Sequence, residues 1–175
     1  MVQEPVAAAV SRRRLGTIGA LFAIGIVVAA VAACSAGSSS GASPSAARLA
    51  GSTVKVTLQE FAVIPDVASV PAGTVTIVVK NTGPEDVHEL VVIKTDLGAA
   101  DLPVDENGKA TEGVPGVTLI GEIEEIAVGE TKQADLELAP GKYVLICNIL
   151  QTEPDGSLEA HYKVGMRTAF EVTAP

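Results

Sequence analysis

Apolar and polar residues alternate in short runs from about residue 53 onward, and these runs predict β-strands. Val54, Val56 and Leu58 alternate with polar neighbours, which is the period-two pattern of a strand with one buried face. Asn81–Pro84 and Ala139–Gly141 are turn signals between later runs. The runs that predict strands cover residues 53–59, 74–80, 88–95, 118–127, 131–138, 143–147 and 167–173.

The spacing of these runs indicates the fold class. Asp96–Gly116 contains glycines, prolines and acidic residues and predicts a long surface loop. Helical periodicity is nearly absent in this part of the chain. Seven or eight short strands separated by turns are typical of an all-β sandwich or barrel with Greek-key connections. We therefore expect residues 53–175 to form one Greek-key β-sandwich.

The first part of the chain has the layout of an export signal. Arg12–Arg14 precede an apolar run, Leu15–Ala33, that ends in small residues. Val31–Cys34 resembles a bacterial lipobox, in which a peptidase cuts before the cysteine and the thiol receives a lipid. The 19-residue run is also long enough for an uncleaved transmembrane anchor. The position of the cysteine favours a signal peptide over residues 1–33 and lipidation of Cys34.

A low-complexity segment follows the apolar run. Residues 34–52 are almost wholly Ser, Gly, Ala and Pro, with Arg48 as the one charged residue. Such a segment cannot bury apolar surface and predicts a flexible tether. We expect the domain to lie on the extracytoplasmic face of the cell membrane. Ser11–Leu15 resembles a twin-arginine motif, but Gly16 stands where a second large apolar residue is expected, so the export route stays open.

Charge and composition exclude several functions. The chain carries 12 Lys and Arg against 21 Asp and Glu, for a net charge of −9, and only 3% aromatic residues. Removal of residues 1–33 takes away three Arg and Glu4, which leaves 9 − 20 = −11. Nucleic-acid binding is not expected, because it needs a basic surface. Acidic residues such as Glu122, Glu124 and Glu125 form either a solvated strand face or a docking surface for a basic partner.

The few histidine, cysteine and methionine residues occur in an order that is typical of a metal site. After signal removal the chain holds two histidines, one methionine and one thiol besides Cys34. These residues are His88, Cys147, His161 and Met166. Taken singly, each is more often a solvated or core side chain. Together they make up the two imidazoles, thiolate and weak axial thioether of a type 1 copper site. His88 follows a turn, Cys147 ends a strand, and His161 and Met166 precede the last strand, so the sequence predicts one copper ion at one end of the sandwich.

Three stretches resemble the cupredoxins, the small blue copper proteins, and most closely their plastocyanin-like and sulfocyanin-like members. These stretches are Asn81–Leu90, Tyr143–Ile149 and His161–Met166, and the resemblance runs from about residue 53 to residue 175. It implies a Greek-key β-sandwich with copper near one end, held by His88, Cys147, His161 and Met166. It also implies that an exposed edge of His161 is the electron port.

The chain departs from the family pattern between the second and third stretches. Thirteen residues separate Cys147 from His161, where the family has two to four, and Gln151–Ala160 has the composition of an inserted loop. Glu89 stands where several members carry Asn or Ser, so we expect the hydrogen bond made there to be absent. Asn148 is a candidate to support the thiolate loop. Tyr162 is expected either to cover His161 or to cap the loop.

These observations lead to a functional hypothesis with stated alternatives. We expect a membrane-anchored type 1 copper protein that carries single electrons between redox partner proteins, and that acts as a monomer. A copper-binding or trafficking lipoprotein without a carrier role is the main alternative, although the chain has no Met-rich or His-rich tract. An enzyme is not expected, because two histidines leave no second metal site for oxygen chemistry. A metal-free adhesion domain would leave the ligand order to chance.

Overall fold

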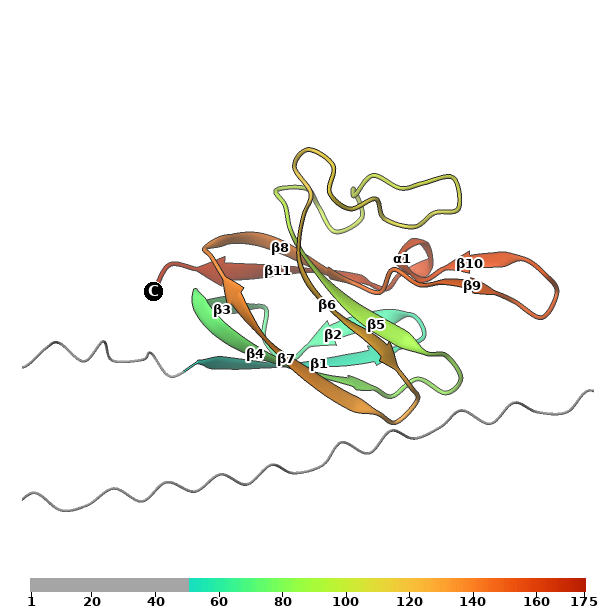
Figure 1. The fold of residues 1–175 in the computed structure, drawn as a ribbon, viewed down its shortest axis with the longest axis horizontal. Helices are drawn as coiled ribbons and strands as arrows, with labels where there is room; N and C mark the ends of the chain where they lie inside the picture. Colours follow the sequence, from blue (N-terminus) through green and yellow to red (C-terminus); the bar gives the residue numbers. More distant parts are fainter. Residues whose placement is uncertain (1–50) are drawn as a thin grey trace, which may run out of the picture. The chain divides into compact units, whose positions relative to one another are not determined.

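The computed structural model describes residues 51–175, which Figure 1 shows as a β-sandwich with a hairpin that protrudes at one end. The predicted signal peptide over residues 1–33, the lipidation of Cys34 and the tether up to residue 50 lie outside the described residues. From residue 51 to the end of the chain, no helix is long and apolar enough to cross a bilayer.

Two sheets and a separate hairpin make up the domain. The first sheet has the order β2-β1-β4-β7 and the second has the order β3-β11-β8-β5-β6. The strands of the first are β1 (Ser52–Gln59), β2 (Ala62–Pro65), β4 (Gly73–Asn81) and β7 (Thr131–Leu138). Those of the second are β3 (Ser69–Pro71), β5 (His88–Lys94), β6 (Thr118–Ile126), β8 (Gly141–Ile146) and β11 (Arg167–Thr173). The hairpin is β9 (Leu150–Thr152) with β10 (Leu158–Ala160), followed by the four-residue helix α1 (His161–Val164).

The all-β sandwich expected from the sequence is confirmed. The main core lies between the two sheets, and the inward residues Val54, Val56 and Leu58 of β1 are at most 1% exposed. The chain crosses between the sheets from β4 to β5 and from β6 to β7, as a Greek key does. All seven predicted strands are present. The pattern missed β2, β3, β9 and β10, because three or four residues hold at most two periods of an alternating pattern.

The long segment between β5 and β6 is more than a surface loop. Its residues Leu102, Ala110 and Val117 are 2–5% exposed and form a second core on the outer face of the five-stranded sheet. This cover explains why β5 and β8 are almost continuously apolar, because each is buried on both faces. The expectation of a surface excursion was therefore wrong for these three residues, whereas Leu97 and Val104 of the same segment are exposed.

The inserted segment forms the β9–β10 hairpin and keeps its two ends together. Leu150 pairs with Ala160, and the His161 N–H donates to the Ile149 carbonyl at 2.9 Å. The hairpin thus closes at its base directly between Cys147 and His161, and its tip extends away from the sandwich (Figure 1). Thirteen intervening residues do not separate the two predicted ligands.

Candidate metal centre

A buried asparagine shapes the turn that delivers His88. The Asn81 side chain donates to the carbonyls of Asp86 and Ile126 at 2.7 and 2.9 Å and accepts the Gly83 N–H at 2.9 Å. These bonds fasten residues 81–86 to the end of β6. β5 begins at His88 directly afterwards, so the imidazole enters the end of the sandwich with no exposed surface.

Backbone hydrogen bonds place Cys147 beside the last strand. Cys147 follows β8, and its N–H donates to the Met166 carbonyl at 3.0 Å. The Met166 N–H in turn donates to the His161 carbonyl at 2.9 Å. The peptide groups of the three residues are thereby held next to one another, and Met166 and Cys147 are both 0% exposed in the main core.

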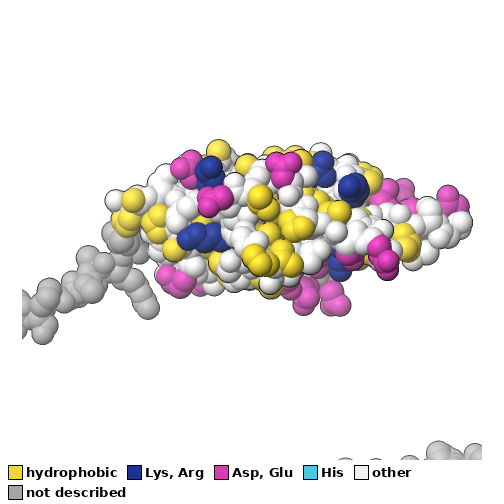
Figure 2. Space-filling view, turned by 90° about the horizontal axis from the view of Figure 1, so that it is seen from above, with side chains coloured by type: hydrophobic (Ala, Val, Ile, Leu, Met, Phe, Trp, Pro, Cys, Tyr) yellow, Lys and Arg dark blue, Asp and Glu magenta, His cyan; other side chains and the backbone are white. Residues whose placement is uncertain are grey.

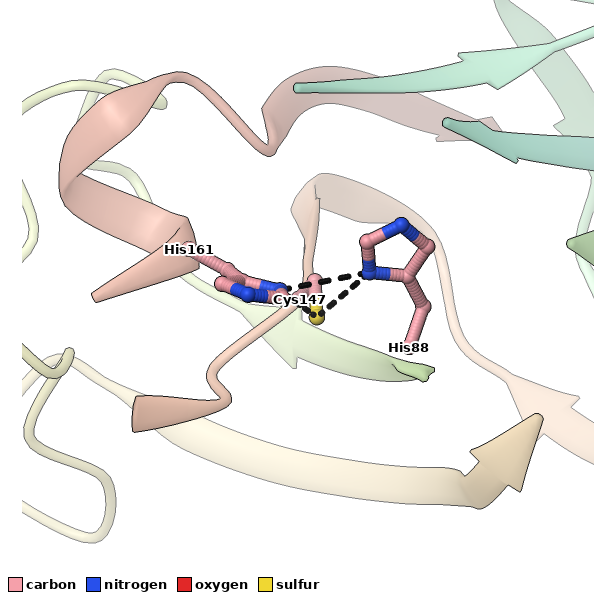
Figure 3. Close-up of side chains that lie close together, drawn as sticks. All are labelled: His88, Cys147 and His161. Carbon is pink, nitrogen blue, oxygen red and sulfur yellow. Dashed lines mark hydrogen bonds between the residues drawn. The ribbon is translucent and has the colours of Figure 1, made fainter. Parts of the chain in front are cut away.

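The two imidazoles and the thiol converge on one point (Figure 3). The Nδ1 atoms of His88 and His161 lie 3.2 Å apart, and the Sγ atom of Cys147 lies 3.9 and 3.4 Å from them. Metal bonds of about 2.0 Å to nitrogen and 2.3 Å to thiolate, as in zinc sites, would separate three donors in a plane by about 3.5 Å. The donor set therefore fits one metal ion without a large movement of the chain.

Burial keeps this donor set neutral before a metal binds. Desolvation lowers the pKa of His88 and of His161, so both imidazoles are unprotonated at neutral pH and free to coordinate. Burial raises the pKa of Cys147 to about 11, so the thiol loses its proton only in exchange for a metal. The Glu89 N–H points at the Cys147 Sγ at 3.5 Å, a backbone donor for the thiolate.

The expectation of an exposed His161 edge is wrong. His161 is 0% exposed, and no histidine is visible on the face in Figure 2. The ring of Phe61 meets the His161 ring edge-on at 5.7 Å between centroids and is itself 36% exposed. In the hairpin, Gln151 Nε2 donates to Asp86 Oδ1 at 2.8 Å and so ties β9 to the turn before His88.

Asn148 and Tyr162, the two candidate supporting residues, both hold the long loop. The Asn148 side chain accepts the Ala110 N–H at 2.7 Å and donates to the Ala110 carbonyl at 2.9 Å. It also donates to Glu112 Oε1 at 2.9 Å. Tyr162 Oη accepts the Leu102 N–H at 3.1 Å and donates to the Ala99 carbonyl at 3.0 Å. Of the two alternatives for Tyr162, the structure excludes a cover over His161, since the phenol packs in the second core.

Two carboxylates near the donors were misjudged or missed. Glu89 does form a hydrogen bond, because its Oε1 accepts the Asn148 N–H at 3.1 Å. This bond links β5 to the segment that follows Cys147. Glu60 was not anticipated at all, yet its Oε1 lies 3.4 Å from His88 Nε2. No sequence signal relates Glu60 to His88, since the two meet only through the fold.

Comparison with known proteins places the chain in a family. It matches the family described as cupredoxin-like domain over residues 24–159, and it belongs to this family. The match includes His88 and Cys147 and ends before His161 and Met166. No curated protein matches the chain.

Several solved structures are similar to the chain. Auracyanin from Roseiflexus castenholzii is 23% identical, with a TM-score of 0.47 and coverage of 71% of this chain and 98% of that one. Auracyanin A from Chloroflexus aurantiacus, a blue copper protein, is 21% identical, with a TM-score of 0.43 and coverage of 69% and 98%. An azurin from Methylomonas sp. strain J is 19% identical, with a TM-score of 0.41 and coverage of 70% and 98%.

Family membership and the donor set together indicate the cofactor. Imidazole and thiolate donors in a buried trigonal arrangement suit copper in both oxidation states. The chain is therefore a cupredoxin-like protein whose buried donor set fits one copper ion.

Proposed function

We propose that this protein is a lipid-anchored, single-electron carrier that works outside the cytoplasm. His88, Cys147 and His161 would hold the copper ion, and Met166 would be its weak axial ligand. When bound, the ion supplies a one-electron Cu(II)/Cu(I) couple. The observation that carries the proposal is the convergence of two Nδ1 atoms and one Sγ atom, all fully buried, at one end of a rigid sandwich.

The chain's own contribution is a donor set that does not have to rearrange. The peptide groups of Cys147, His161 and Met166 are bonded to one another, and the β9–β10 hairpin closes the segment between the first two. A framework fixed in this way keeps the donors in place in both oxidation states. It also excludes water, because none of the donor residues is exposed.

An acidic groove beside Phe61 supports a basic-faced redox partner. Electron transfer slows steeply with distance, so a partner must approach where the cover over the donors is thin, and Phe61 contacts His161 directly. The groove next to this ring is lined by Phe61 and by carboxylates from the chain around it, namely Glu60, Glu85, Asp86, Glu153 and Glu159. Figure 2 shows acidic side chains toward the hairpin end of the molecule. Charge complementarity would speed the encounter and make it sensitive to salt.

The anchor is proposed from the sequence. A lipid on Cys34 and the Ser/Gly/Ala-rich residues 34–52 would let the domain move between partners at the membrane surface. The signal segment over residues 1–33 would place the domain on the extracytoplasmic side.

One pair of cysteine variants tests the copper site and the anchor separately. Copper-loaded wild-type protein should show an intense blue absorption band that a reductant bleaches and an oxidant restores. Cys147→Ser should abolish the band, because the charge-transfer donor is the thiolate. Cys34→Ser should keep the band and lose both the lipid and the cut before residue 34, which the mass of the protein reports.

Different results would count against different parts of the proposal. A colourless wild-type protein, or a band that survives in Cys147→Ser, would refute the electron-carrier role. Tight Cu(I) binding without a reversible couple would favour the trafficking alternative. A wild-type protein whose mass shows no lipid on Cys34 would refute the lipid anchor while leaving the copper site intact.

A further inference from the structure

A buried carboxylate stands behind the first imidazole, on the side away from the donors. Glu60 Oε1 lies 3.4 Å from His88 Nε2, and the two side chains are 12% and 0% exposed. Within residues 51–175, His88 Nε2 has no hydrogen-bond partner, and neither has Glu60 Oε2. A buried ring nitrogen without a partner thus lies beside a carboxylate, and leaving such a nitrogen unsatisfied is costly.

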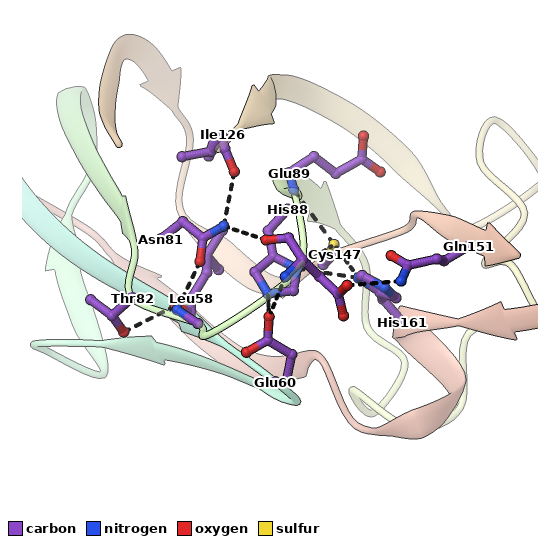
Figure 4. A network of polar contacts seen from close by, with 12 residues as sticks. Leu58, Glu60, Asn81, Thr82, His88, Glu89, Ile126, Cys147, Gln151 and His161 are labelled. Atoms are coloured by element: carbon purple, nitrogen blue, oxygen red, sulfur yellow. Dashed lines mark hydrogen bonds and ion pairs between the residues drawn. The ribbon is translucent and has the colours of Figure 1, made fainter. Parts of the chain in front are cut away.

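The turn that precedes His88 is built around this carboxylate (Figure 4). The Asp86 N–H donates to Glu60 Oε1 at 2.8 Å. Gly83 leaves room for the rest of the group, because a Cβ atom there would lie within 2.6 Å of the Glu60 carboxylate carbon. Asn81 holds both residues in place through its bonds to Gly83 and Asp86. A side chain at position 83 or a shift of the turn would displace the carboxylate.

The carboxylate is charged in this position. A glutamate side chain is an ionised carboxylate at neutral pH, and Glu60 Oε1 accepts the Asp86 N–H at 2.8 Å. Glu60 therefore places a negative charge 3.4 Å from His88 Nε2, on a side chain that is 12% exposed.

We propose that Glu60 is a positioning residue that accepts the Nε2 proton of metal-bound His88 and lowers the reduction potential of the copper. This inference rests on the proposed function and names a residue that sets the reduction potential of the copper site. A histidine that binds a metal through Nδ1 carries its proton on Nε2, and such protons are normally donated to a carboxylate or carbonyl. Glu60 is not itself a ligand, since it contacts the nitrogen that faces away from Cys147.

The direction of the effect follows from electrostatics. The couple is Cu(II) plus one electron giving Cu(I), and the Nε2 proton stays on His88 throughout. A fixed negative charge nearby stabilises Cu(II) more than Cu(I), because the oxidised site carries one more positive charge. Glu60 also makes the imidazole a stronger donor, which favours Cu(II) in the same direction.

The test compares a charge-removing variant with a matched control. Glu60→Gln keeps an acceptor for Nε2–H and removes the charge. We expect the ratio of Cu(II) to Cu(I) affinity to fall about tenfold, which is a rise of about 59 mV in the midpoint potential. Glu171→Gln makes the same charge change on the exposed part of β11, opposite Lys142 at the other end of β8, and should leave the potential unchanged.

Two further measurements keep the outcome decisive. Gly83→Ala retains the charge of Glu60 but displaces the carboxylate, and it should raise the potential in the same direction. In the metal-free protein, the NMR signal of the His88 Nε2 proton should lie downfield in the wild type and move upfield in Glu60→Gln. This signal reports the contact even if the wild type proves to have no reversible copper couple, in which case the proposed function fails and the contact stands.

The inference is overturned if folded Glu60→Gln and Gly83→Ala both have the wild-type potential. It is also overturned if the His88 Nε2 proton signal does not respond to the loss of the carboxylate. If Glu60→Gln does not fold, the potential of Gly83→Ala decides.

Discussion

Asn148→Ala should detach the long loop from the copper end of the sandwich. The Asn148 side chain is 4% exposed and is the partner of both the N–H and the carbonyl of Ala110, at 2.7 and 2.9 Å. Alanine removes both bonds and leaves two polar backbone groups unpaired beside a residue that is 5% exposed.

The expected magnitude follows from those two groups. Each buried, unsatisfied backbone group costs about 1–3 kcal/mol, so the free energy of unfolding should fall by about 2–6 kcal/mol. The bond to Glu112 adds little, because that carboxylate can turn to water. A domain of this size has about 5–15 kcal/mol in total, so the variant should still fold at room temperature.

Equilibrium unfolding in urea measures this loss. The midpoint should fall, and a decrease in the m-value would show that the loop is already undocked in the native state, because less surface then remains to be exposed. Asn107→Ala is the matched control, since Asn107 is exposed on the same loop and its side chain makes no bond there, and its change should stay within about 0.5 kcal/mol. A loss below about 1 kcal/mol for Asn148→Ala would refute the assignment of Asn148 as the anchor of the loop.

Two other variants probe the surroundings of the site. Tyr162→Phe removes the hydroxyl that bonds Leu102 and Ala99, and urea unfolding should show a loss of about 1–3 kcal/mol, whereas an unchanged midpoint would mean that water replaces the phenol. Burial and the neighbouring carboxylate of Glu112 raise the pKa of Glu122, so the folded state binds more protons than the unfolded state and stability falls as pH rises above the usual carboxyl value. At neutral pH the free energy of unfolding of Glu122→Gln, measured in urea, should therefore exceed that of the wild type by less than about 0.5 kcal/mol after solvent screening. This gain should disappear below about pH 4.5, and a gain that is the same at all pH values would contradict the reasoning.

The seven longer strands could be predicted from the sequence, because alternating or continuously apolar runs of six or more residues are a local property of the chain. The donor residues could be predicted for a similar reason, since His88, Cys147, His161 and Met166 are scarce residue types in a recognisable order. The short strands were missed because three or four residues are too few to show an alternating pattern.

The sequence by itself determined the fold class and the four residues that we propose as ligands, because strand periodicity and donor chemistry are carried by the side chains themselves. Only the tertiary structure decided that His161 is buried beneath Phe61 and that Asn148 and Tyr162 face the long loop. It alone brought Glu60 to His88. Each of these facts depends on which segments pack side by side, and residues as distant in sequence as Tyr162 and Ala99 carry no local pattern that records their contact.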